Sequence, residues 1–132
     1  MFEYTKVVTS FSVDDVPTAQ RFYGETLGLK LSAESGALLL HLAGGNDTLI
    51  YPKPDHIPAS YTVLNFVVAD IDSAVDRLVE RGVRFLRYDE FRADDKGIVR
   101  GPDRDIAWFS DPAGNIHSVV QSRTPLPVQG NS

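Results

Sequence analysis

The side chains best suited to acid–base or metal chemistry in this chain are its three histidines, His41, His56 and His117. His117 lies in the stretch SDPAGNIHSVVQS, residues 110–122, just after a glycine–asparagine turn and beside a serine. No two histidines have a metal-ligand spacing such as HExxH, and no GxSxG motif marks a nucleophilic serine. The chain has no cysteine, which excludes thiolate chemistry, disulfides and cysteine-based zinc sites. His56 lies in a proline-rich connection, PKPDHIPAS, where we expect solvent exposure or a structural hydrogen bond. The roles of His41 and His117 depend on which face of its strand each occupies.

Composition narrows the class of partner. The 132 residues carry a net charge of −5, which disfavours nucleic acid or an anionic membrane as the main partner. The start, MFEYTKVV, lacks the basic segment and apolar run of a signal peptide, and no apolar stretch approaches the roughly 18 residues that cross a bilayer. We therefore expect a cytoplasmic protein that binds neither nucleic acid nor membrane.

The chain repeats itself. Asp15 matches Asp70 and Ala19 matches Ala74 at an offset of 55 residues, and each copy indicates a strand, an acidic turn, a helix, a glycine and a second strand. In the second copy the apolar residues follow a helical spacing, Asp70, Asp72 or Ser73 can cap the start, and a glycine suits the end. The helical stripe of the second copy consists of Ile71, Ala74, Val75 and Leu78.

The remaining half of each copy also repeats, at an offset of 69 residues. ALLLHLAGGNDTLIYP aligns with AWFSDPAGNIHSVVQ, and both indicate two strands joined by a glycine–asparagine turn. The sequence thus predicts one domain, residues 1–122, of two βαβββ modules at about 5–55 and 60–122. Residues 123–132 are expected to form a flexible tail. The polar segment 89–105 is expected to be a loop, either a lid over a site or a solvated, salt-bridged surface.

Three stretches resemble the vicinal oxygen chelate superfamily: SVDDVPTAQRFYGETLGLKL, VVADIDSAVDRLVERGV and WFSDPAGNIHSVVQ. That superfamily includes glyoxalase I, extradiol dioxygenases, fosfomycin-resistance enzymes and bleomycin-resistance proteins. The resemblance implies an α+β fold in which paired βαβββ modules form a half-open curled sheet (the glyoxalase/bleomycin-resistance fold), and a homodimer. TLIYPKPDHIPASYTVLNF further resembles a glyoxalase-like bacterial branch.

Enzymes of the superfamily bind a divalent metal through His, Gln and Glu side chains on four strands. Carried over by the resemblance, those positions fall on Val8, Leu49, Val63 and Ser118. Valine and leucine have no donor atom, and a lone serine hydroxyl is a poor ligand. We therefore expect no metal in the usual place and no cofactor.

Strand alternation assigns the remaining side chains, because successive residues point to opposite faces. The former ligand positions define the inner face, which we call the cup. His117 then points away from the cup and toward the helices, together with Phe109, and so do Val7, Phe11 and Val13. The residues expected to face the cup and bind a ligand are Val8, Ser10, Leu39, His41, Leu49, Tyr51, Val63, Asn65, Val67, Trp108, Ile116 and Ser118.

This lining is mostly apolar with a few polar groups, which is typical of a small-molecule site. The first hypothesis is a metal-free protein that sequesters a hydrophobic or aromatic molecule, such as an antibiotic or natural product, in the bleomycin-resistance manner. The alternative is a metal-independent glyoxalase-like lyase or isomerase in which His41 is the acid–base residue. A third alternative, a displaced metal site using a histidine and a carboxylate, lacks any ligand-like spacing.

Overall fold

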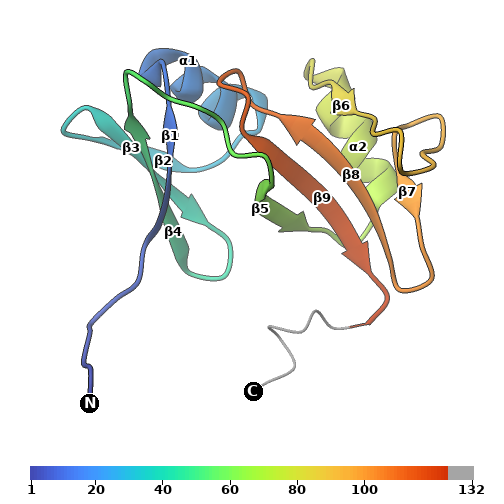
Figure 1. Cartoon of the computed structure of the whole chain (residues 1–132), viewed down its shortest axis with the longest axis horizontal. Coiled ribbons are helices and arrows are strands. Elements are labelled where there is room, and N and C mark those ends of the chain that lie inside the picture. Colours follow the sequence, from blue (N-terminus) through green and yellow to red (C-terminus); the bar gives the residue numbers. More distant parts are fainter. Residues whose placement is uncertain (125–132) are drawn as a thin grey trace. The chain divides into compact units, whose positions relative to one another are not determined.

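The computed structural model describes residues 1–124, so most of the expected tail, residues 125–132, lies outside the described residues. The chain divides into two compact units, Met1–Pro58 and Ala59–Ser132, which are described separately below (Figure 1). The side chain of Arg123 forms an ion pair with Asp105 at 3.0 Å, so that residue is tied to the second unit. No helix in the described part of the chain is long and apolar enough to span a membrane.

The first unit has an open four-stranded sheet in the order β1-β4-β3-β2. Strands β1 and β4 are parallel, and the other neighbours are antiparallel. Its elements are β1 (Thr9–Val13), α1 (Val16–Arg21), a π-helical turn η1 (Phe22–Thr26), β2 (Leu31–Glu34), β3 (Ala37–Leu42) and β4 (Asn46–Pro52).

The second unit repeats this topology in the order β5-β9-β8-β6, with a short extra strand, β7, also paired to β8. Helix α2 packs on β8 and β9 of the same sheet (Figure 1). Its elements are β5 (Thr62–Val67), α2 (Ile71–Glu80), β6 (Phe85–Leu86), β7 (Val99–Arg100), β8 (Arg104–Ser110) and β9 (Ile116–Ser122). The prediction of an α+β fold built from two βαβββ modules is confirmed.

Strand register reproduces both offsets of the sequence repeat. Ser10 pairs with Leu49 in the first unit, and Asn65 pairs with Ser118 in the second. Across the neighbouring strand, Leu39 pairs with Leu49 and Trp108 pairs with Ser118. The two units therefore present equivalent positions on equivalent faces.

The helices begin alike and end differently. Asp15 and Asp70 are the N-caps, with carboxylates that accept from backbone N–H groups three residues later at 3.1 and 3.3 Å. From cap to closing glycine, the first copy is one residue longer than the second. Gly28 and Gly82 both adopt a positive φ after the helix, at 71° and 95°. The π-helical turn η1 accommodates the extra residue, because a π-turn holds one more residue than an α-turn.

The buried side chains follow the predicted alternation in most places. Phe11 and Val13 on β1 are buried at 7% and 0% exposure, and Phe109 on β8 at 1%. Val7 was expected among them and is instead 70% exposed, because β1 begins only at Thr9 and the residues before it do not pair. Alternation therefore holds only within the paired strand.

Candidate functional site

A pocket lined largely by aromatic side chains opens in the second unit. Its volume is about 230 Å³, and Glu90 is the charged residue in its lining. Four segments build it: the residues leading into β5, the loop after β6, β8 and β9. We call it the aromatic pocket; its lining residues are Ser60, Tyr61, Thr62, Tyr88, Glu90, Phe91, Trp108 and Ile116.

Trp108 is the centre of this cluster. Its ring lies 5.3 Å from Tyr88 at an interplanar angle of 78°, an edge-to-face arrangement, and 5.3 Å from Phe91 at 30°. Such ring pairs add about 0.5–1.5 kcal/mol to the free energy of burial. Phe91 and Tyr61 remain 48% and 71% exposed, so apolar ring surface still faces the solvent at the pocket.

The loop that carries Tyr88 and Phe91 is held by polar contacts at its base. The Arg87 guanidinium donates to the backbone carbonyls of Asp94 and Asp95, each at 2.9 Å. Asp94 in turn accepts from the backbone N–H groups of Lys96 and Ile98 at 2.9 Å. The loop is therefore ordered by its own hydrogen bonds.

Ion pairs join the same loop to helix α2. Arg100 binds Asp72 at 2.8 Å and Asp94 at 3.0 Å, and Lys96 binds Asp76 at 3.0 Å. These contacts, with Asp72 as the largest cause, raise the pKa of Arg100. The segment is therefore salt-bridged, and it is not wholly a loop, because it contains β7 and the start of β8.

A row of three paired residues crosses the sheet beside the pocket. Asn65 on β5 pairs with Ser118 on β9, which pairs with Trp108 on β8. Paired residues of neighbouring strands point to the same face, so the predicted cup positions 65, 108 and 118 do share one face. The Ser118 hydroxyl donates to the Asn65 Oδ1 atom at 2.6 Å.

The strand β5 is irregular at Val63. Thr62 pairs with Ile116 and Leu64 pairs with His117, which leaves Val63 as an extra residue between them. As a result Thr62, and not the predicted Val63, lines the aromatic pocket. Val67 lies two residues beyond Asn65 on the same face and is 51% exposed.

His117 lies on the opposite face, in the core. It is 0% exposed, its Nδ1 atom accepts from the Leu64 backbone N–H at 3.3 Å, and its ring stacks edge-to-face against Phe109. Burial lowers the pKa of His117 to about 4, although the nearby Asp111 carboxylate acts in the other direction. The prediction that this histidine points away from the cup and is buried in the core is confirmed.

The remaining predicted cup residues lie in the first unit. Ser10, Leu39 and Leu49 form a paired row across β1, β4 and β3, equivalent to the row in the second unit. Tyr51 is 36% exposed, and Val8 precedes β1 and is 45% exposed. Each unit thus contributes its own set of inner-face residues.

His41 belongs to a hydrogen-bonded chain on this first sheet. Its Nε2 atom lies 3.1 Å from the Ser32 hydroxyl, and its Nδ1 atom lies 3.3 Å from an Asp47 carboxylate oxygen. Lys6 donates to the other Asp47 oxygen at 2.9 Å and holds the pKa of that carboxyl below its ordinary value. Sequence reasoning singled out His41 but missed both of its partners.

His56 lies apart from this chain. Its Nδ1 atom is 2.7 Å from the Ser12 hydroxyl. Ser12 lies near the end of β1, and His56 follows β4 in the segment that leads to the second unit.

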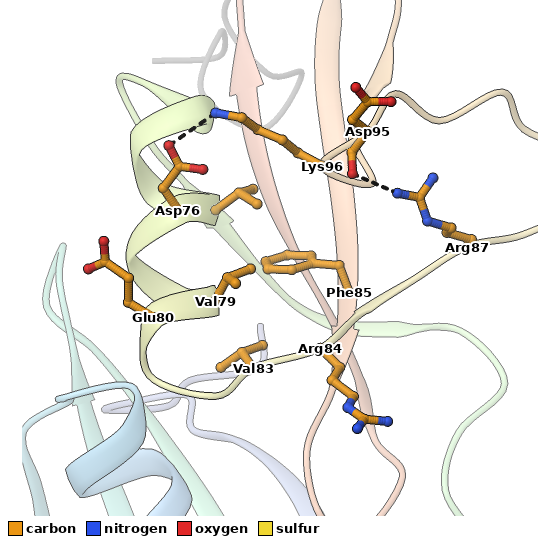
Figure 2. Close-up of a pocket in the computed structure, with 10 residues that line it drawn as sticks. Asp76, Val79, Glu80, Val83, Arg84, Phe85, Arg87, Asp95 and Lys96 are labelled. Carbon is orange, nitrogen blue, oxygen red and sulfur yellow. Dashed lines mark hydrogen bonds and ion pairs between the residues drawn. The ribbon is translucent and has the colours of Figure 1, made fainter.

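A larger groove of about 690 Å³ lies on the helix side of the second unit (Figure 2). Its apolar floor includes Val79 and Phe85, but its rim carries charges of both signs. Figure 2 shows that some of the rim charges are engaged: Lys96 donates to Asp76, and Arg87 donates to the backbone carbonyl of Asp95. The groove is therefore where the loop is fastened to α2.

The residues at the superfamily's metal positions do not fit a metal ion. Three are aliphatic, and the hydroxyl of Ser118 is fully buried and donates to Asn65. Within residues 1–124 there is also no cluster of three or more His, Asp or Glu side chains that could hold a metal.

Sequence reasoning placed Trp108 and Ile116 in the cup, and both line the aromatic pocket, but it did not predict that Tyr88 and Phe91 would join them. The available signal was RYDEF, in which Tyr88 and Phe91 are aromatic residues inside an otherwise polar segment. That segment has no counterpart in the first module, so the repeat could not place it.

Paired βαβββ units with open sheets are the architecture that the resemblance to the vicinal oxygen chelate superfamily implied. The family model of the Glyoxalase/Bleomycin resistance protein/Dioxygenase superfamily matches residues 7–117. The chain belongs to this superfamily. A comparison with curated protein sequences finds no significant match.

Solved structures agree over nearly the whole chain. TnmS3, an antibiotic binding protein from Streptomyces sp. CB03234, is 27% identical with a TM-score of 0.65, over 92% of this chain and 99% of its own. A glyoxalase/bleomycin resistance protein from the same organism is also 27% identical, with a TM-score of 0.59, over 89% of this chain and 100% of its own. A glyoxalase family protein from Bacillus anthracis, 22% identical with a TM-score of 0.67 over 93% and 100% of the two chains, shows the shared fold.

Proposed function

We propose that this protein binds an aromatic small molecule at the aromatic pocket without a metal and holds it chemically unchanged. The observation that carries the proposal is the exposed ring surface around Trp108, where Phe91 and Tyr61 leave room for another flat molecule. Sparse polar groups on an apolar lining suit orientation of a ligand. The likeness to TnmS3, an antibiotic binding protein, supports a role in small-molecule binding.

The site residues of the proposal are Trp108 and Ile116 in the pocket, with Asn65, Val67 and Ser118 on the same inner face. Thr62 takes the place of the predicted Val63 in the pocket. In the first unit, considered by itself, the residues proposed to bind a ligand are Val8, Ser10, Leu39, His41, Leu49 and Tyr51. The proposal also retains the homodimer and the cytoplasmic location expected from the sequence.

Native mass spectrometry after incubation with an extract of aromatic metabolites tests the function directly. The expected result is a dimer mass with an added small molecule that is released at its original mass. Release of a molecule of altered mass would contradict sequestration and favour an enzyme.

The pocket is tested by calorimetric titration with 2-isopropenylnaphthalene as an aromatic probe. Trp108→Ala should weaken binding at least about tenfold, because a buried aromatic anchor commonly contributes 2 kcal/mol or more. Trp108→Phe should restore part of the affinity. Val79→Ser, in the helix-side groove, is the matched control and should leave affinity unchanged; the reverse pattern would place the ligand in that groove.

The second candidate function is a metal-independent lyase or isomerase, favoured by the contact of His41 with Asp47 at 3.3 Å. An aspartate on one ring nitrogen orients the imidazole, which leaves the Nε2 atom beside Ser32 as the proton-transfer atom. If this function holds, His41→Gln should abolish conversion of the substrate to the product of altered mass. The affinity for the substrate should stay within about twofold of wild type.

A further inference from the structure

The polar row beside the aromatic pocket contains a side-chain donor whose direction is fixed. Ser118 is 0% exposed, and its hydroxyl donates to Asn65 Oδ1 at 2.6 Å. This distance is typical of an O–H···O bond and short for an N–H···O bond. The oxygen of the Asn65 amide is therefore occupied by a hydrogen bond within the protein.

Rotation of the Asn65 amide by half a turn would be unfavourable. It would bring the NH2 group against the Ser118 oxygen and leave the buried hydroxyl proton without this acceptor. An unsatisfied buried polar group costs about 1–3 kcal/mol. The Asn65 Nδ2 atom, which has two hydrogens to donate, makes no hydrogen bond to any described residue.

Asn65 is exposed, and its side chain lies on the same face as Trp108. The two residues are separated by β9, that is, by two strand spacings of about 4.8 Å each. A two-ring aromatic molecule with one short substituent spans about that distance. The inner face therefore combines a ring platform at one end with an amide donor at the other.

From this geometry we infer that the ligand is an aromatic molecule bearing a carbonyl oxygen, which stacks at Trp108 and accepts a hydrogen bond from Asn65 Nδ2. The inference rests on the proposed function and specifies its ligand class. Ser118 is a positioning residue: it occupies a former metal-ligand position and orients the amide without touching the ligand.

A pair of isosteric probes tests the inference. 2-Acetylnaphthalene and 2-isopropenylnaphthalene share the same rings and shape. The first carries a carbonyl oxygen where the second carries a CH2 group. In Asn65→Asp a carboxylate oxygen still accepts from the Ser118 hydroxyl, but the N–H group that would donate to the ligand is lost. Affinity for the ketone should fall about fivefold to tenfold, the usual worth of one hydrogen bond, and affinity for the alkene should stay within twofold.

Ser118→Ala tests the positioning role. The amide then loses the bond that fixes its direction, so the ratio of ketone to alkene affinity should fall by about half or more while the alkene still binds. Ser118→Thr retains the hydroxyl and should restore the ratio.

The outcomes separate the two proposals. If both probes bind in a Trp108-dependent manner and their affinity ratio is unchanged in Asn65→Asp and Ser118→Ala, the carbonyl inference is wrong and the proposed function stands. If neither probe binds, the proposed function fails and the inference fails with it.

Discussion

At the scale of single residues, the contrast between His117 and His41 shows how a strand face determines chemistry. His117 is enclosed by aromatic rings and held neutral, whereas His41 lies part-exposed between a hydroxyl and a carboxylate. The first unit has Thr48 at the position equivalent to His117. Thr48 is 2% exposed and bonds to the Thr9 hydroxyl at 2.8 Å, so both units place a satisfied polar group in the core.

His117 should make stability depend on pH. The pKa of His117 is about 4 in the folded protein and 6.5 in an unfolded chain. Between these two pH values the unfolded chain binds a proton that the folded protein does not. Stability from this group is therefore complete above pH 6.5 and declines as pH falls toward 4, by about 2–3 kcal/mol at pH 4.5.

Urea unfolding at pH 7.5 and pH 4.5 measures that loss. His117→Gln keeps an acceptor for the Leu64 N–H but does not titrate, and it should lose about 2–3 kcal/mol less than wild type over this interval. The carboxylates titrate in both proteins and cancel in the comparison. Equal losses in the two proteins would show that His117 does not titrate as described.

At the scale of elements, the loop between β6 and β8 determines the aromatic pocket, because it carries Tyr88 and Phe91. The nearly buried carboxylate of Asp105 helps to hold the end of this loop, because it accepts from the Arg123 guanidinium at 3.0 Å. This contact lowers the pKa of Asp105 to about 2. Arg100 connects that region to α2 through Asp72. The loop is thus ordered by contacts with α2 and Arg123 in addition to its own hydrogen bonds.

Removal of the Arg100 side-chain charge should loosen the loop more than it destabilises the fold. Exposed ion pairs contribute about 0–1 kcal/mol each, so Arg100→Gln should lower the free energy of unfolding only slightly. Amide hydrogen exchange should accelerate in residues 94–98 and leave β9 unchanged. Arg84→Gln is the control, since Arg84 forms no ion pair with the described residues; equal acceleration in both variants would contradict this role.

At the scale of the whole molecule, the two units repeat the same strand register. Equivalent positions carry Leu49 and Ser118, and neither unit supplies a histidine or carboxylate there. A protein of this construction should function through side-chain packing and hydrogen bonds.

Chelation should therefore leave the protein unaffected. After treatment with EDTA and dialysis, the affinity for 2-isopropenylnaphthalene and the Tm should match those of the untreated protein, because binding of a ligand to the folded state is what would raise stability. Added Zn²⁺ or Mn²⁺ should not raise either value. A fall in Tm on chelation that is reversed by one metal would show that a metal contributes to the folded state.

The sequence by itself determined the features that repeat with a short period or at a fixed offset. Strand alternation placed His117 in the core and Trp108 on the inner face, and the offsets of 55 and 69 residues predicted two modules of the same topology. Such patterns are local, because each strand or helix imposes its own geometry on its neighbours in the chain.

Only the tertiary structure decided which side chains complete the site. Tyr88 and Phe91 reach Trp108 because hydrogen bonds and ion pairs fasten their loop to a distant helix, and Thr62 reaches the pocket because β5 is irregular at Val63. Neither contact follows from periodicity, since both depend on residues far apart in the chain. The same reason explains why sequence analysis found His41 without Ser32 and Asp47: their contacts form only once three strands pair.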